Sequence, residues 1–120
     1  MPEAAVTIDP ATLEDLLEFR RQRDWQQFHS FRNVATALLV EVAELLEIVQ
    51  WTADAALPER LLEKRTDIEM ELADVAILLS YLVHDLGIDL DAAVRRKLAL
   101  NEERYPVALA RGNSRKYDEL

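Results

Sequence analysis

The stretch Val34-Ala-Thr-Ala-Leu-Leu-Val-Glu41-Val-Ala-Glu44-Leu-Leu-Glu-Ile-Val-Gln-Trp51 decides the fold of this chain. It is an apolar run of several helical turns that carries two carboxylates three residues apart, Glu41 and Glu44. A second apolar run carries a matching pair, Glu71 and Asp74. Residues three apart lie side by side on one face of a helix, so each pair can act on the same object.

Carboxylates in this setting need a positive partner. The neighbours of Glu41 one helical turn away are Ala37, Leu38 and Leu45. Burying an ionised carboxylate without a partner costs several kcal/mol, and four that face one another also repel. Acidic residues at this spacing are often a solvated helix face, but the apolar flanks argue against that alternative. We therefore expect a cation among the four carboxylates.

The composition predicts an all-α fold. The chain has 120 residues, two glycines and four prolines, and its apolar residues lie in long runs without turn signals. This length fits one domain, residues 1–120, with a loose N-terminus at 1–8 and a tail at 107–120. We expect a bundle of four to five helices: 10–28, 31–51, 58–86 with a second start offered by Thr66-Asp67, and 90–105.

Short local signals set the helix ends. Asp9 before Pro10, Ser30 and Asp89 are predicted N-caps, because their side-chain oxygens can accept from free backbone N–H groups. Gly87 suits the left-handed position that closes a helix, and Pro106 stops the last one.

The composition also excludes several classes of protein. The net charge of −9 argues against binding to nucleic-acid polymers, which depends on phosphate neutralisation. The absence of cysteine and of signal-peptide features predicts a cytoplasmic protein. The carboxylates interrupt the apolar runs before membrane-spanning length, so we expect no membrane association.

One predicted helix is apolar on every side. From Leu72 to Val83 only Asp74, Ser80 and Tyr81 are polar. Such a helix needs cover that a chain this small can hardly provide. We therefore expect a homo-oligomer, a dimer or a tetramer.

The donor set narrows the choice of metal. Carboxylate oxygens suit Mg²⁺, Ca²⁺ or Mn²⁺. Neither His29 nor His84 stands three residues after a glutamate, so the Glu-x-x-His pairs of di-iron bundles are absent and zinc is also disfavoured. No glycine-rich phosphate loop and no nucleophile-elbow pattern occur.

Further segments carry a resemblance to a known family. Glu41-x-x-Glu44 with Glu71-x-x-Asp74 resembles the metal signature of the MazG-like all-α nucleoside triphosphate pyrophosphohydrolases. The flanking segments are similar to the dCTP pyrophosphatase branch over nearly the whole chain. They are Phe19-Arg-Arg-Gln-Arg-Asp-Trp25-Gln-Gln-Phe-His29, Arg32-Asn33, Gln50-Trp51, Asn101-Glu-Glu-Arg-Tyr-Pro106 and Ser114-Arg-Lys-Tyr117.

The resemblance implies hydrolysis of a nucleoside triphosphate, such as dCTP or a modified dCTP, to the monophosphate and pyrophosphate. It also assigns roles to residues. The catalytic metal ligands for Mg²⁺, with Mn²⁺ as a substitute, are Glu41, Glu44, Glu71 and Asp74. The base and sugar contacts are Trp25, Gln26, Gln27, Phe28, His29 and Trp51. Lys97, Asn101 and Arg111 are candidates for phosphate contacts, because of their charge and their position near the C-terminal motif. A glutamate that is not fully committed to the metal, Glu44 or Glu47, is a candidate general base.

Two positions depart from the branch, and two other classes of protein stay open. Leu78 stands where the branch commonly has a tyrosine, and Leu16 where it can carry a histidine, so the base preference is open. One alternative is a non-catalytic oligomeric regulator whose carboxylates pair with Arg32 or Lys97. Another is a metal-binding protein without turnover. Trp25 and Phe28 could also be core residues.

Overall fold

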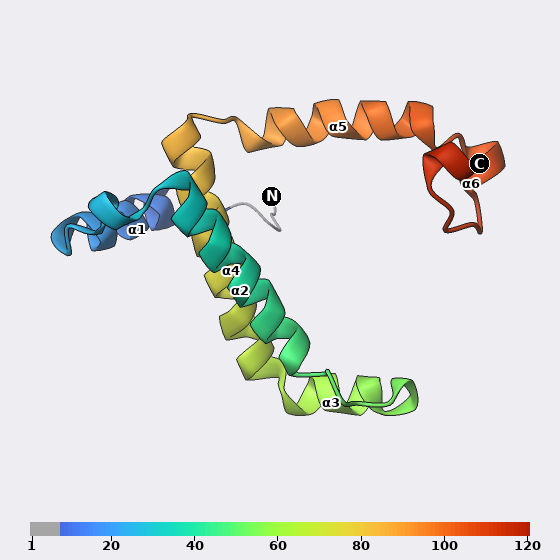
Figure 1. The fold of residues 1–120 in the computed structure, drawn as a ribbon, viewed down its shortest axis with the longest axis horizontal. Coiled ribbons are helices and arrows are strands. Elements are labelled where there is room, and N and C mark those ends of the chain that lie inside the picture. Colours follow the sequence, from blue (N-terminus) through green and yellow to red (C-terminus); the bar gives the residue numbers. More distant parts are fainter. Residues whose placement is uncertain (1–7) are drawn as a thin grey trace. The chain divides into compact units, whose positions relative to one another are not determined.

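The computed structural model describes residues 8–120, and every regular element within that range is helical. The α-helices are α1 (Pro10–Gln22), α2 (Phe31–Glu47), α3 (Leu57–Glu63), α4 (Arg65–Leu86), α5 (Leu90–Arg104) and α6 (Val107–Ala110) (Figure 1). Three 3-10 turns accompany them: η1 (Trp25–Phe28), η2 (Asp54–Ala56) and η3 (Tyr117–Glu119). The all-α prediction is confirmed. The predicted number of helices is wrong, because α6 lies in the segment that we expected to be a tail.

The chain forms two compact units, one up to Leu86 and one from Gly87 to Leu120. In the first unit, α2 and α4 pack side by side and run in opposite directions (Figure 1). Val34 on α2 and Tyr81 on α4 are the buried apolar residues of the described chain. None of the helices in residues 8–120 is long and apolar enough to cross a bilayer.

The predicted helix caps are confirmed. Ser30 Oγ accepts from the backbone N–H of Asn33 at 3.2 Å, at the start of α2. Asp9 and Asp89 accept in the same way at the starts of α1 and α5, at 2.9 Å and 3.0 Å. Gly87 has φ +64°, the left-handed conformation expected after α4. These contacts are local, which is why the sequence predicts them well.

The first helix is shorter than predicted. It ends at Gln22 instead of continuing to residue 28. Asp24 adopts φ 53°, and aspartate is one of the few residues that tolerate this left-handed conformation. The Gln27 side chain donates to the backbone oxygen and to Oδ2 of Asp24, both at 3.0 Å. The segment Trp25–Phe28 is therefore a separate 3-10 turn.

The second and third predicted helices also differ at their junctions. Helix α2 ends at Glu47, four residues before Trp51. Arg60 Nε donates to the Ile48 carbonyl at 2.9 Å, so a side chain satisfies an oxygen that helix continuation would have used. A break at Lys64 separates α3 from α4, which confirms that the predicted helix 58–86 consists of two pieces.

The second unit has its own contacts. Its tail returns to the end of α5, where the Tyr105 and Tyr117 rings meet edge to face, 6.1 Å between centroids. The Arg104 guanidinium lies 4.4 Å from the Tyr117 ring centroid. These contacts place the tail of this unit on its own helix.

Removing the Ser30 cap tests the start of α2. We expect Ser30→Ala to lower the free energy of unfolding by about 1 kcal/mol, because one backbone N–H loses its acceptor. Urea unfolding followed by circular dichroism at fixed protein concentration measures this change. Ser114→Ala, outside any helix, is the control, and equal stabilities of the two variants would contradict the role of the cap.

Candidate active site

Three carboxylates converge where α2 and α4 pack together. Glu41 and Glu44 lie on α2, and Glu71 lies on α4. One oxygen of each carboxylate lies within 4.8 Å of the others. The three-residue spacing places the first two on one face of α2, and the packing of the helices brings Glu71 opposite them. We call these three residues the acidic cluster.

The acidic cluster is electrostatically strained. Glu41 Oε2 and Glu71 Oε2 are buried without a hydrogen-bond partner. Burial, together with the neighbouring carboxyl groups of Glu71, Glu44 and Asp74, raises the pKa of Glu41 to about 7. A protonated Glu41 can donate to its neighbours, whereas three ionised carboxylates can only repel. Among the ion pairs between described residues, none neutralises the cluster.

The residues present fit a divalent cation. The donors are all carboxylate oxygens, which Mg²⁺ and Mn²⁺ prefer, and two of them are buried without a partner. A cation would offset the burial and the neighbouring negative charges that raise the pKa of Glu41. Asp74, the fourth predicted ligand, lies one turn beyond Glu71 and is exposed. Its charge acts on Glu41, but it does not belong to the three-residue cluster.

The predicted base-contacting segment forms an aromatic row with its neighbours. The Trp25 ring lies 5.7 Å from the ring of Phe19 and 6.2 Å from that of His29. His29 lies 5.4 Å from the ring of Tyr81 on α4. Trp25 and Phe28 are 42% and 60% exposed, so they are not core residues of this unit.

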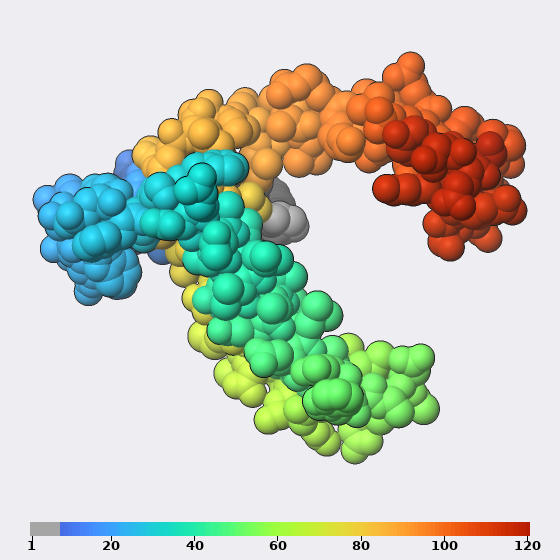
Figure 2. Space-filling model, in the orientation of Figure 1, coloured from blue at the N-terminus to red at the C-terminus, as the bar shows by residue number. Residues whose placement is uncertain are grey.

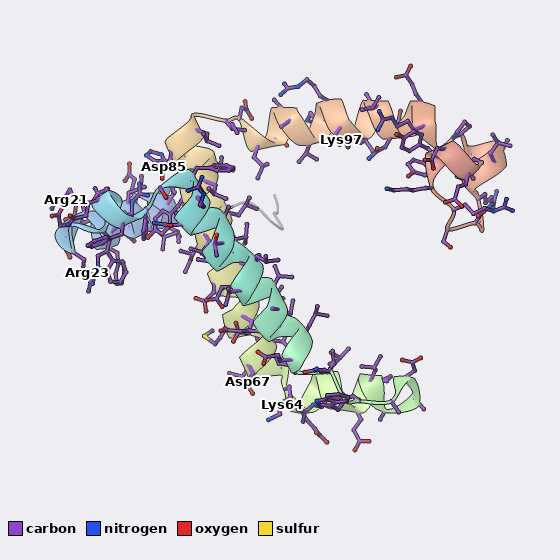
Figure 3. All side chains as sticks on the ribbon, viewed as in Figure 1. Arg21, Arg23, Lys64, Asp67, Asp85 and Lys97 are labelled. Atoms are coloured by element: carbon purple, nitrogen blue, oxygen red, sulfur yellow. The ribbon has the colours of Figure 1, made fainter. Side chains whose placement is uncertain are left out.

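The other predicted contacts are dispersed. Gln26 and Gln27 are exposed, and the Gln27 amide bonds to Asp24. Trp51 is 90% exposed in the turn after α2. Lys97, labelled in Figure 3, and Asn101 lie four residues apart on α5, and Arg111 follows α6. The last three belong to the second unit, so their contact with phosphates stays a prediction, as do the roles of Glu44 and Glu47 as a general base.

Sequence reasoning missed a partly buried ion pair beside the aromatic row. Arg20 on α1 is 5% exposed and donates through two nitrogens to Asp85. Figure 3 labels Asp85, near the end of α4. A signal for Arg20 was present, because it continues the helical spacing of Leu13, Leu16 and Leu17. Nothing in the sequence identifies Asp85, 65 residues away, as its partner.

The fold and the acidic cluster define an all-helical protein with a site suited to a divalent cation. The model of the MazG-like family matches residues 37–120, which include the acidic cluster. The chain is 44% identical over 115 residues to dCTP pyrophosphatase 1 of Homo sapiens and 43% identical over 115 residues to that of Rattus norvegicus. Each match covers 91% of this chain and 68% of the relative.

A solved structure agrees with this assignment. The crystal structure of a pyrophosphatase from Archaeoglobus fulgidus superimposes with a TM-score of 0.78 and 37% sequence identity. The match covers 87% of this chain and 99% of the archaeal one. The chain therefore belongs to the MazG-like family, as one of its pyrophosphatases.

The strain on Glu41 predicts a pH-dependent stability. The folded chain holds the Glu41 proton up to about pH 7, whereas the unfolded chain releases it near 4.5. Stability of the metal-free protein should therefore fall as the pH rises from 4.5 through 7. We expect Glu41→Gln to raise the melting temperature of metal-free protein at pH 8 by a few degrees and to give no gain below pH 4.5.

The same variant tests the cation. Wild-type protein should gain melting temperature with millimolar Mg²⁺ at pH 8, and Glu41→Gln should lose most of that gain, because a ligand is missing. Differential scanning fluorimetry with and without EDTA measures both effects. A lower melting temperature of metal-free Glu41→Gln at pH 8 would show that the carboxylate is not strained.

Proposed function

We propose that this protein hydrolyses a deoxynucleoside triphosphate to the monophosphate and pyrophosphate, with Mg²⁺ as cofactor and Mn²⁺ as a substitute. This activity would remove unwanted nucleotides from the precursor pool. The observation that carries the proposal is the acidic cluster, with carboxylate oxygens within 4.8 Å on two packed helices and no ion pair within the described chain. The relatives named dCTP pyrophosphatase 1 support a nucleotide substrate.

Each part of the chain has a role in this proposal. Glu41, Glu44, Glu71 and Asp74 hold the cation. When bound, Mg²⁺ neutralises phosphate charge and orients the triphosphate for in-line attack. The residues of α2 and α4 fix the position of the carboxylates before substrate arrives. An ionised glutamate that is not fully committed to the metal, Glu44 or Glu47, takes the proton of the attacking water.

The aromatic and basic residues complete the substrate contacts. Trp25 offers an exposed ring face for stacking on the base, and Trp51 offers a second. Lys97, Asn101 and Arg111 contact the phosphates. Because Leu16 and Leu78 replace polar positions of the dCTP pyrophosphatase branch, the substrate class includes dCTP, modified dCTP and other dNTPs.

We also propose that the protein works as a homo-oligomer, a dimer or a tetramer. Few apolar side chains are buried in the described chain, while large ones on α2 are exposed: Leu39 is 70% and Leu46 is 63% exposed. These two are seven residues apart and therefore share one face of the helix. Figure 2 shows that part of the α2 surface is not covered by other elements of its unit. Apolar faces of this kind are typically covered by another subunit.

Measuring pyrophosphate release from several dNTPs tests both the proposed reaction and the preference for a nucleobase. We expect purified protein with Mg²⁺ to release pyrophosphate from at least one member of a panel of dNTPs that includes modified cytosines. Glu44→Gln and Asp74→Asn should each lower the rate by about a hundredfold or more, because each removes a proposed metal ligand. Ion chromatography separates pyrophosphate from phosphate.

Asp67→Asn is the matched control for this experiment. Asp67 is also on α4, in its first turn, and its carboxylate pairs with Lys64 at 3.8 Å (Figure 3). Its activity should stay close to that of wild type. If no dNTP of the panel yields pyrophosphate, the proposed reaction is wrong. A melting temperature that still rises with Mg²⁺ would then identify a metal-binding protein without turnover.

Charge on the apolar face of α2 should break the oligomer. We expect wild-type protein to have the mass of a dimer or tetramer and the double variant Leu39→Glu/Leu46→Glu to have that of a monomer, because burying two carboxylates in an interface is unfavourable. Size-exclusion chromatography with light scattering measures the masses. Arg21→Glu, on α1, is the control. A monomeric wild-type protein would contradict the proposal.

A further inference from the structure

Arg20 and Asp85 form a partly buried, bidentate ion pair in the first unit. Arg20 Nη1 donates to Asp85 Oδ2 at 2.9 Å, and Nη2 donates to Oδ1 at 2.8 Å. The guanidinium carbon lies 4.6 Å from the centroid of the Tyr81 ring. The Tyr81 hydroxyl donates to the Leu16 carbonyl at 3.0 Å. Two parallel hydrogen bonds and a stacked ring hold the positive charge of Arg20 in one place.

His29, which follows the 3-10 turn η1, contacts the ring of Tyr81. Its ring lies 5.4 Å from that of Tyr81 and 6.2 Å from that of Trp25. His29 Nδ1 is buried without a hydrogen-bond partner, although the residue as a whole is partly exposed. The imidazole therefore has one nitrogen on the buried side, toward the protein, and a second nitrogen, Nε2, that is free to bind another group.

The charges around His29 favour its neutral form. Burial and the positive charge of Arg20 lower the pKa of His29 below its usual value, while the negative charge of Asp85 opposes them. A neutral imidazole carries its proton on one nitrogen only. An N–H buried without an acceptor near a cation is doubly unfavourable, whereas a lone pair in that position is attracted by the positive charge.

We propose that the Arg20–Asp85 pair is a positioning pair for His29, which it keeps neutral with the lone pair on Nδ1 and the proton on Nε2. His29 then presents a fixed hydrogen-bond donor beside the partly exposed ring of Trp25. Such a donor fits an acceptor on the edge of a nucleobase that stacks on the tryptophan. The statement about the base depends on the proposed function, but the tautomer of His29 does not.

In this proposal His29 supplies the hydrogen bond to the nucleobase, in place of the polar side chains that the dCTP pyrophosphatase branch can carry at the positions of Leu16 and Leu78. Leu16 and Leu78 have no side-chain hydrogen-bonding groups, and both are partly buried. Tyr81 uses its hydroxyl on the backbone of Leu16, so it holds α1 against α4. His29 is a polar group whose ring contacts Trp25, and in this proposal Arg20 determines how its nitrogens are presented.

Nitrogen NMR of the imidazoles tests the tautomer without substrate. The chain has two histidines, so two imidazoles appear, and His84→Gln assigns them. In wild-type protein at neutral pH we expect His29 Nδ1 to have the chemical shift of an unprotonated nitrogen and Nε2 that of a protonated one. The opposite assignment, or a charged imidazole, would overturn the proposal.

Two variants of neighbouring arginines separate positioning from stability. We expect Arg20→Met to give a mixture of His29 tautomers and a higher pKa of His29, because the buried positive charge is lost. Arg21→Met should change neither, because Arg21 pairs with exposed Glu18 on the same helix. An unchanged His29 spectrum in folded Arg20→Met would count against the positioning role. If that variant does not fold, the wild-type spectrum still decides the tautomer.

Kinetics with the best dNTP identify the nitrogen that the substrate contacts. The glutamine amide reaches the position of Nε2, whereas the asparagine amide reaches that of Nδ1. We therefore expect His29→Asn to raise KM about tenfold and His29→Gln about threefold, with kcat less affected, since one hydrogen bond is lost or kept. Arg20→Met should raise KM in the same range as His29→Asn, and Arg21→Met should leave it unchanged.

The outcomes distinguish this inference from the proposed function. Pyrophosphate release by wild-type protein with equal KM values for the asparagine and glutamine variants would refute the donor role of Nε2 alone. No release from any dNTP would refute the proposed function, while the NMR result would still support or refute the positioning of His29 by Arg20.

Discussion

The packing of α2 against α4 is the contact on which the site depends. Glu41 and Glu44 on α2 meet Glu71 on α4, so the packing of the two helices also gathers like charges. Apolar side chains at these positions would stabilise the pair better. The raised pKa of Glu41 is the measure of this conflict. Strain of this kind is typical of functional sites, where a ligand restores the balance.

A second buried charge in the same unit, that of Arg20, is neutralised by another residue of the chain. Arg20 is almost completely buried, but it has a bidentate partner in Asp85 and a stacked ring in Tyr81. The acidic cluster has no such partner among the described residues. The contrast separates a charged group that organises the protein from charged groups that await a ligand. Helix α4 carries a residue of each group, Glu71 of the acidic cluster and Asp85 of the ion pair. The acidic cluster needs a positive ligand, whereas the ion pair is already neutral.

The helix starts were predictable, and the breaks were less so. Ser30 and Asp89 cap α2 and α5 through contacts that span three residues, so local sequence determines them. Helix α1 ends early because Asp24 adopts a left-handed conformation. Residue type alone did not predict this conformation, since aspartate tolerates it but does not require it. The end of α2 also escaped prediction, since Arg60, twelve residues further on, satisfies the Ile48 carbonyl.

The sequence by itself determined the helical class, the spacing of the carboxylates and the chemistry that they favour, because these depend on residue type and on a fixed helical repeat. Only the tertiary structure decided which groups meet. It joined Glu71 to Glu41 and Glu44 but left Asp74 outside the closest group, and it paired Arg20 with Asp85 across 65 residues. Burial and charge act through space, so the pKa of Glu41 and the environment of His29 follow from packing that no local pattern specifies.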